Sequence, residues 1–324
     1  MKKIAVIGAG LSGLTFALRL NSKVDVTVFE KSRGIGGRMA TRYSEHYEFD
    51  HGAQYFTAKG KAFQNFLDPY IEQGIVQNWQ PNLVTLSNEG LKERVSNHPS
   101  YVASPRMNAL AKDIAANLNL IGSTHIEKIV GEAGAWELID KEGLSHGTYD
   151  YVIFAIPSHQ AAVLMPDNFE HLKQIKRAKM DACFSLMLGF DKPLEIDFDG
   201  AFVEGSSIGW ISVNSSKPER PKGFSIMVQS QNQWAKANVD KDKDKVQAAL
   251  LEEASKLLKQ DLSNAEHQVL HRWLYASTSV PLEQSFFIDE RNQLACIGDW
   301  CIKGRVEAAF DSGNQLAEKM SSIL

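Results

Sequence analysis

The sequence has few cysteines, no long apolar run and little net charge, and each shortage argues against a class of protein. Three cysteines in 324 residues are too few for a disulfide framework, and Cys296 and Cys301 lack the paired histidines of a zinc site. We therefore expect no metal site and a reducing, cytoplasmic environment. No apolar run reaches the roughly 18 residues that a membrane-spanning helix needs. The net charge of −4 gives no electrostatic reason to expect a nucleic-acid partner.

The N-terminus allows two interpretations. Lys2 and Lys3 precede a mostly apolar stretch, residues 4–20, as they would in a secretory signal peptide. That stretch, however, contains three glycines at fixed spacing, has no small-residue cleavage site and runs directly into a strand-like segment. We therefore expect a folded N-terminus that is not secreted. We also expect no membrane tail at the C-terminus, residues 320–324.

Hydrophobic patterning predicts a βαβ unit at the start of the chain. Residues 3–7 and 24–29 are short apolar or β-branched segments typical of strands, and residues 11–20 between them favour a helix. Such a unit implies a parallel sheet with a right-handed crossover. Further helices are predicted over residues 63–73, 106–119, 246–259 and 306–321. Further strands are predicted over residues 149–156, 182–190, 209–213, 224–230, 268–276 and 294–297, with a meander over residues 125–139.

The first strand leads into Gly8-Ala-Gly10-Leu-Ser-Gly13, a G-x-G-x-x-G turn at the start of a helix. Gly8 allows the tight turn, Gly10 leaves room for a pyrophosphate, and Gly13 lets helix and strand pack closely. The helix N-terminus offers free N–H groups and a partial positive charge to the phosphates. Glu30, at the end of the second strand, can accept hydrogen bonds from a ribose. These elements predict a dinucleotide site and leave open whether the dinucleotide is FAD or NAD.

Two further segments favour FAD. Gly36-Gly37-Arg38 resembles the G-G-R element of flavin amine oxidases and their relatives, in which backbone and arginine approach the pyrophosphate. In flavoproteins of that kind a Gly-Asp pair, here Gly298-Asp299, places a carboxylate on a ribityl hydroxyl. The N-terminus of the next helix, near Val306, would point its dipole at the flavin and favour the negative charge that reduction brings. The predicted cofactor-binding residues are Gly8, Gly10, Leu11, Ser12, Gly13, Glu30, Lys31, Gly36, Gly37, Arg38, Met39, Gly52, Ala53, Gln54, Tyr55, Ile126, Gly298, Asp299, Arg305 and Val306.

Longer motifs, spread over nearly the whole chain, narrow the resemblance. They are KSRGIGGRM (31–39), FDHGAQYFT (49–57), SKP (216–218), HRWLYA (271–276) and GDWC (298–301). Together they resemble the bacterial renalases, a branch of the FAD-dependent amine oxidase superfamily. The resemblance implies a non-covalent FAD and an oxidase of the 2- and 6-dihydro isomers of NAD(P)H. Such an enzyme returns NAD(P)⁺ and passes electrons to O₂, giving H₂O₂.

One position departs from that pattern. Gln229 stands where the renalase family often has a histidine, a few residues before the pair Gln233-Trp234. If that histidine holds the nicotinamide in the family, the substrate preference of this chain would differ.

The expected chemistry directs the choice of catalytic candidates. Hydride transfer from a dihydronicotinamide needs alignment and exclusion of water more than acid–base help, because the product cation is aromatic. Residues 49–56, with Asp50 and Gln54 as polar members, are the candidate segment beside the flavin ring. In the second half of the chain, alternate residues of one strand would share a face that could line either a cavity or the core. The predicted catalytic residues are Gln54, Asn214, Gln229, Trp234, His271, Trp273 and Tyr275, and Trp210 is a further candidate for the wall of the site.

The expected fold class is α/β. A Rossmann-like FAD-binding domain (residues 1–58, 102–170 and 285–324) would be interleaved with an α+β substrate domain built on an antiparallel sheet (residues 59–101 and 171–284), and the active site would lie between them. A small-molecule substrate and O₂ are the expected partners. Two alternatives to the renalase-like oxidase stay open. One is a flavin amine oxidase or another C–N or C–H oxidoreductase on the same scaffold, and the other is a non-catalytic FAD-binding redox sensor.

Overall fold

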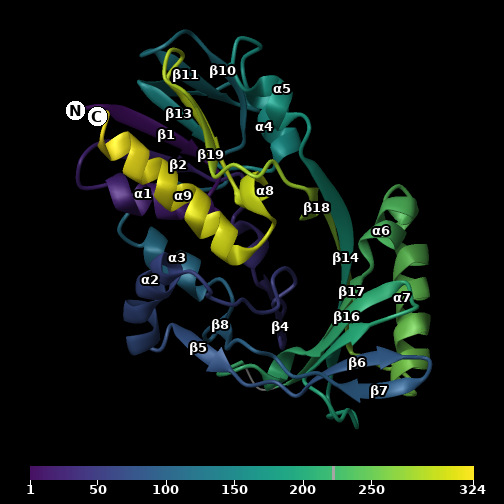
Figure 1. Cartoon of the computed structure of the whole chain (residues 1–324). Coiled ribbons are helices and arrows are strands. Elements are labelled where there is room, and N and C mark those ends of the chain that lie inside the picture. Colours follow the sequence, from purple (N-terminus) through teal and green to yellow (C-terminus); the bar gives the residue numbers. More distant parts are fainter. Residues whose placement is uncertain (221–222) are drawn as a thin grey trace.

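The computed structural model describes residues 1–220 and 223–324, and three larger sheets organise the fold (Figure 1). The first is six-stranded, with the order β19-β20-β13-β1-β2-β9, and its strands run parallel except for β19. Its strands are β1 (Lys3–Ile7), β2 (Asp25–Phe29), β9 (Asn119–Ile121), β13 (Tyr151–Phe154), β19 (Phe286–Asp289) and β20 (Leu294–Ile297). This sheet contains the predicted βαβ unit, in which β1 pairs with both β2 and β13.

Both faces of the six-stranded sheet are covered, which explains why its strands are apolar throughout. One face packs on helices α1 (Leu11–Leu20), α3 (Ala109–Ala115) and α9 (Val306–Ser321), and α9 lies alongside α1 in Figure 1. The helix α2 (Lys61–Glu72) joins that layer, since the rings of Phe63 and Phe310 lie 5.0 Å apart. The other face packs on a three-stranded meander and two short helices. These elements are β10 (Ile126–Val130), β11 (Trp136–Asp140), β12 (Ser145–Tyr149), α4 (Ser158–Leu164) and α5 (Leu172–Ile175).

The largest sheet has seven strands, in the order β18-β14-β17-β16-β15-β6-β7. Its strands are β6 (Leu83–Ser87), β7 (Gly90–Glu93), β14 (Lys179–Phe190), β15 (Gly200–Val203), β16 (Ile208–Val213), β17 (Phe224–Ser230) and β18 (His267–Val280). Helices α6 (Asn232–Asn238) and α7 (Lys243–Leu258) cover its outer face (Figure 1). Asp242 caps the N-terminus of α7, since its carboxylate accepts hydrogen bonds from the N–H groups of Asp244 and Lys245.

Side chains alternate across this sheet and give it two chemically different faces. On β14, Phe184, Leu186 and Leu188 belong to the core beneath α6 and α7. The intervening Ser185 and Met187 face the other way, toward residues 47–54. The inner face of the sheet therefore meets the segment that the sequence places beside the flavin.

The remaining elements are short. They are the strand pairs β3 (Arg42–Tyr43) with β4 (Glu48–Phe49) and β5 (Val76–Trp79) with β8 (Ser100–Ala103), the single-turn helices η1 (Gly37–Met39) and η2 (Asn214–Ser216), and α8 (Asp299–Ile302). The helix predicted over residues 106–119 was too long, because residues 119–121 pair with β2 as strand β9. The strands between residues 76 and 103 were not predicted. Two of them, β6 and β7, extend the seven-stranded sheet, while the division of the chain into two domains stays a prediction.

Candidate cofactor and active site

The glycine-rich turn has the close packing that its spacing predicts. Gly8 follows β1 with φ of +110°, and a Cβ atom there would lie 2.5 Å from the carbonyl oxygen of Ala155. A Cβ atom on Gly13 would lie 2.2 Å from the carbonyl oxygen of Gly8. Both distances are shorter than side-chain contacts allow, so both positions require glycine. The turn therefore brings the start of α1 directly against the end of β1.

Space and free donors are left where a phosphate would bind. A Cβ atom on Gly10 would meet no atom within 4 Å, and no side chain caps the N-terminus of α1. The Oγ atom of Ser12 is buried and has no hydrogen-bond partner among the described residues. Leu11 is buried in the core, so only its backbone could reach a ligand. These features fit a dinucleotide pyrophosphate at the helix N-terminus.

Glu30 is held in a fixed orientation at the end of β2. It is buried, and its carboxylate accepts hydrogen bonds from the backbone N–H groups of Ala9 (3.0 Å) and Ser32 (2.8 Å). The carboxylate is thereby fixed beside the glycine-rich turn, as a ribose-binding role requires. Lys31 is exposed beside it.

The second glycine pair packs on the first turn. The N–H of Gly36 donates to the carbonyl of Ala9 (2.9 Å), and a Cβ atom on Gly37 would lie 3.3 Å from Cα of Gly10. Met39, two residues on, is buried in the core, which indicates packing as the role of its side chain. The predicted cofactor segments 8–13 and 36–38 are thus neighbours in space.

Residues 50–54, which the sequence predicts to lie beside the flavin ring and which are called the flavin-facing segment below, pass directly over Arg38. The N–H of Ala53 donates to the carbonyl of Arg38 (2.8 Å), and a Cβ atom on Gly52 would lie only 2.0 Å from that oxygen. The Arg38 guanidinium forms a two-pronged ion pair with the buried carboxylate of Asp299 and donates to the carbonyl of Ala276 (3.2 Å). The predicted cofactor segments 8–13, 36–38, 50–54 and 298–299 therefore lie next to one another.

The Arg38–Asp299 pair also links the two ends of the chain. The carbonyl of Asp299 accepts from the N–H groups of Lys303 and Gly304 (both 2.9 Å), which holds the start of α9 beside α8. Arg305 is exposed at the N-terminus of α9, and no side chain caps that end. The uncapped N-terminus of α9 is therefore held near Asp299, and its role toward the flavin stays a prediction.

On its other side the flavin-facing segment is anchored by side chains of the seven-stranded sheet. The carbonyl of His51 accepts hydrogen bonds from Oγ of Ser185 (2.8 Å) and Nε1 of Trp273 (2.9 Å). The carbonyl of Gly52 accepts from Nε2 of Gln229 (2.8 Å). Gln229 and Trp273, predicted as catalytic, therefore hold the backbone of the segment.

Histidine and tryptophan rings gather at the same place. The ring of His51 lies 4.8 Å from that of His271 and 4.9 Å from that of Trp273, while His271 and Trp273 are 4.4 Å apart. Burial, reinforced by the neighbouring His271, lowers the pKa of His51 to about 4. Burial, with a smaller contribution from Arg42, lowers the pKa of His271 to about 4. Both rings are therefore neutral at pH 7, and this wall is aromatic and uncharged.

Beneath the segment lies a cluster of charged residues that sequence reasoning missed. Asp50, Lys217 and Arg220 have almost fully buried side chains. Oδ2 of Asp50 lies 3.3 Å from Nζ of Lys217 and 2.6 Å from Nη2 of Arg220. Burial alone would raise the pKa of Asp50, but Lys217 and Arg220 hold it below its ordinary value. Burial lowers the pKa of Lys217 to about 8, although Asp50 opposes this, so at pH 7 the cluster carries two positive charges and one negative charge.

Several predicted residues are engaged within the protein. Nε2 of Gln54 donates to the carbonyls of Asp50 and Gly52, and its Oε1 accepts from Ser212 and Lys217. All four hydrogen-bonding positions of the Gln54 amide are therefore used, and its predicted contact with substrate gains no support.

Asn214 is used in the same way. Its amide bridges the carbonyl of Glu48 and the N–H of Asp50, and it also accepts from Lys217 (3.0 Å). This amide fixes the start of the flavin-facing segment.

Other candidates lie apart from the His51 cluster. Trp234 is on α6, which covers the outer face of the seven-stranded sheet, and its ring lies 6.0 Å from that of Phe184. Tyr275 stacks on His159, and Tyr55 packs between Trp79 and Trp210. Ile126, at the start of β10, is buried in the core that β10–β12 share with the six-stranded sheet, and its contact with the cofactor stays a prediction. Trp234 lies on α6 and not on β18, so the seven-stranded sheet separates it from His271 and Trp273.

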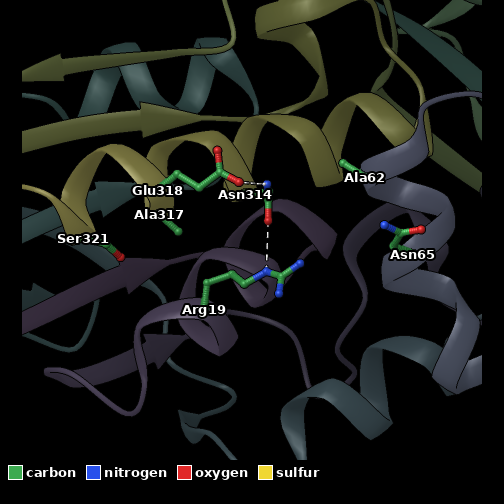
Figure 2. Close-up of a pocket in the computed structure, with 7 residues that line it drawn as sticks. All are labelled: Arg19, Ala62, Asn65, Asn314, Ala317, Glu318 and Ser321. Atoms are coloured by element: carbon green, nitrogen blue, oxygen red, sulfur yellow. Dashed lines mark hydrogen bonds between the residues drawn. The ribbon is translucent and has the colours of Figure 1, made fainter.

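The structure also records a separate hollow of about 320 Å³ between α1, α2 and α9 (Figure 2). In this hollow Nε of Arg19 donates to Oδ1 of Asn314 (2.9 Å), whose amide donates to Glu318 (2.7 Å). It lies at the far end of α1 from the glycine-rich turn and is no part of the site. Among residues 1–220 and 223–324, no cluster of potential metal ligands occurs. Within the same residues no helix has the length and apolarity needed to cross a membrane.

Comparison with known protein families decides the class. Residues 6–70 match the NAD(P)-binding Rossmann-like domain, and residues 60–321, most of the chain, match the flavin-containing amine oxidoreductase family. The chain belongs to the flavin-containing amine oxidoreductase family. The predictions of an α/β Rossmann-like fold, of a non-covalently bound FAD and of an FAD-dependent oxidoreductase are thereby confirmed.

Individual relatives are more distant. The 4,4'-diapophytoene desaturase of Staphylococcus aureus strain Newman is 39% identical over 77 residues, which is 20% of this chain and only 15% of that protein. A crystal structure assigned as a protoporphyrinogen oxidase from Exiguobacterium sp. 255-15 superposes with a TM-score of 0.81 over 100% of this chain and 99% of that one, at 13% identity. Putrescine oxidase bound to putrescine gives 0.73 over 99% of each chain, at 10% identity. These two likenesses concern the fold alone.

Proposed function

We propose that this family member is a renalase-like oxidase, which takes a hydride from the 2- or 6-dihydro isomers of NAD(P)H. The products would be NAD(P)⁺ and, with O₂ as electron acceptor, H₂O₂. The FAD would be held by the glycine-rich turn, Glu30, the Gly36–Arg38 segment and Asp299, and it supplies the hydride acceptor. The remaining task of the chain is to orient a flat donor ring and to exclude water.

One observation carries this proposal: the wall beside the flavin-facing segment is aromatic and neutral. It consists of His51, His271 and Trp273, and both imidazoles are uncharged at pH 7 because burial lowers their pKa values to about 4. A dihydronicotinamide is itself a flat, uncharged ring, and loss of hydride makes it an aromatic cation without any proton transfer. A wall of neutral rings therefore supports a donor of this kind, and cation–π attraction would stabilise the charge that develops.

The same geometry gives less support to a cationic amine as the donor. The carboxylate of the flavin-facing segment, Asp50, is not available to an ammonium substrate, because it is buried and already paired with Lys217 and Arg220. Oxidation of an amine by this family member is the alternative that a test must separate from the proposal.

Anaerobic stopped-flow absorbance makes that separation. We expect 2- or 6-dihydroNAD to bleach the flavin far faster than ordinary NADH or any of a panel of primary and secondary amines. Changing His271 to Ala should slow the bleaching, whereas His46→Ala, at an exposed position, should leave it unchanged. Equal rates with all the nicotinamides, or bleaching by amines alone, would refute the proposal.

A further inference from the structure

The cluster of Asp50, Lys217 and Arg220 has a charge imbalance that the fold alone does not require. Lys217 and Arg220 each contribute a positive charge, and both contact the single carboxylate of Asp50. The hydroxyl group of Thr41 and the N–H of Met107 also donate to Asp50, at 3.0 Å each. These two groups, Lys217 and Arg220 therefore all interact with the same carboxylate. Buried charges are costly unless they are paired, and this cluster keeps one unit of positive charge in excess.

Lys217 is built into its place as a cation. Its Nζ atom lies within hydrogen-bond distance of three acceptors, which are Oδ2 of Asp50 (3.3 Å), Oε1 of Gln54 (3.2 Å) and Oδ1 of Asn214 (3.0 Å). An ammonium group has three N–H donors and no acceptor, so these contacts use all its donors. The ring of Trp79 lies 5.9 Å from the same atom, an arrangement that also favours a cation.

The position of the cluster connects this charge with the cofactor. Asp50 and Gln54 are the ends of the flavin-facing segment, which crosses over Arg38 at Gly52 and Ala53. Arg38, in turn, is paired with Asp299, so its own charge is balanced. The cluster therefore adds a net positive charge along this wall.

We infer that the Asp50–Lys217–Arg220 cluster is an electrostatic device of the cofactor site, whose net positive charge favours reduction of the bound FAD. Reduction places negative charge on the flavin ring, and a buried positive charge stabilises it across a medium of low dielectric constant. Lys217 and Arg220 act through space and are positioning residues. The inference goes beyond the proposed function, because it concerns the cofactor and not the donor, although it rests on the location of the flavin beside residues 50–54.

The test is a reductive titration of the FAD-loaded protein against reference dyes, which measures the midpoint potential without any substrate. Lys217→Met and Arg220→Met each bring the cluster to zero net charge, yet only the first removes the contacts with Gln54 and Asn214. Lys256→Met removes a lysine charge from an exposed ion pair with Glu252 on α7 and is the matched control.

We expect both cluster variants to shift the potential to more negative values. The equilibrium between reduced and oxidised flavin should move roughly tenfold toward the oxidised form, and Lys256→Met should move it hardly at all. A wild-type potential in either cluster variant, folded and loaded with FAD, would overturn the inference. If Lys217→Met fails to fold, Arg220→Met alone tests the inference. Because no donor is used, failure here would leave the proposed oxidase reaction untouched, and failure of that reaction would leave this result untouched.

Discussion

The flavin-facing segment contacts the Rossmann side of the protein and the seven-stranded sheet in two different ways. Toward the Rossmann side, backbone lies against backbone, and a Cβ atom on Gly52 would be 2.0 Å from the carbonyl oxygen of Arg38. Toward the sheet, the contacts are made by side chains, with Gln229 and Trp273 donating to two carbonyls and Lys217 placed beneath Asp50. The packing on the Rossmann side therefore requires that side-chain atoms be absent, whereas the contacts on the sheet side are made by polar and charged groups.

The difference predicts different responses to change. Backbone packed at such distances has no room to relax, so an added methyl group is strongly destabilising whatever the solution conditions. Hydrogen bonds to shared acceptors can be lost one at a time, because the acceptor keeps a second donor. Charges and imidazoles add a dependence on pH that the backbone packing lacks. Three substitutions and a change of pH test this contrast.

Asp50→Asn should have the largest effect on the sheet side. It leaves Lys217 and Arg220 buried without a carboxylate, which should lower the free energy of unfolding by about 4 kcal/mol. Urea unfolding of the variant measures this loss. Glu252→Gln, which removes a carboxylate from an exposed ion pair, is the control and should leave the free energy of unfolding almost unchanged. Equal losses in the two variants would show that the buried cluster contributes nothing special.

Gly13→Ala tests the Rossmann side. Its Cβ atom would lie 2.2 Å from the carbonyl oxygen of Gly8, and relief requires the backbone to move. We expect a loss of about 3 kcal/mol in the free energy of unfolding. At exposed Gly34 a Cβ atom meets nothing within 4 Å, so Gly34→Ala should stay within about 0.5 kcal/mol of the wild type. An unaffected Gly13→Ala variant would contradict the steric account.

The pH dependence of stability should come from the histidines on the sheet side. Folding holds the pKa of His51 and that of His271 near 4, below the ordinary value of 6.5. Between pH 6.5 and 4 the unfolded chain binds more protons, so stability should fall with falling pH, by on the order of 2 kcal/mol for His51. Urea unfolding at several pH values measures the slope. His51→Phe should flatten it and the exposed His46→Gln should not, and an unchanged slope in His51→Phe would refute this origin.

Gln229→Leu should have the smallest effect of the four. It removes the hydrogen bond to the carbonyl of Gly52, but that oxygen keeps Nε2 of Gln54 at 3.1 Å. We expect a loss of about 1 kcal/mol in stability, together with a changed visible absorption spectrum of the bound flavin. The matched change is Gln77→Leu on β5, whose amide donates to the carbonyl of Gly74 (3.2 Å) and which should leave the spectrum as it is. Identical flavin spectra in the two variants would show that Gln229 does not influence the flavin.

The same difference between the Rossmann side and the sheet side explains which features could be predicted from the sequence. The glycine spacing at 8, 10 and 13, the acid at Glu30 and the helix over 306–321 follow local rules of sterics and periodicity, so these features of the Rossmann side were predictable from the sequence. The sheet side depends on which face of each strand a residue occupies and on what lies opposite. The sequence predicts His271, Trp273 and Tyr275 on one face of a strand, but only His271 and Trp273 lie together, whereas Tyr275 stacks on His159. The contact of His271 and Trp273 with His51 joins residues more than 200 positions apart.

Lys217 shows the limit most clearly. Its Ser-Lys-Pro setting is that of an exposed turn, and lysines are almost never fully buried unless they are paired. The partner, Asp50, lies 167 residues earlier in the chain, and only the tertiary fold brings the two together. Strand β9 was missed for a similar reason, because three residues joining the edge of a sheet carry too little periodicity to be distinguished from the end of a helix.

We propose that the turn at residues 8–13 is shaped for the cofactor as well as for the fold, and FAD binding by the Gly10→Ala variant tests this proposal. In this structure the added Cβ atom meets no protein atom within 4 Å, and the backbone there (φ −76°, ψ 171°) suits alanine. Titration of the purified apoprotein with FAD, followed by absorbance and fluorescence, should show one tightly bound FAD in the wild type. In the variant it should show a stably folded protein that no longer retains FAD. Equally tight binding by the folded variant would contradict the account.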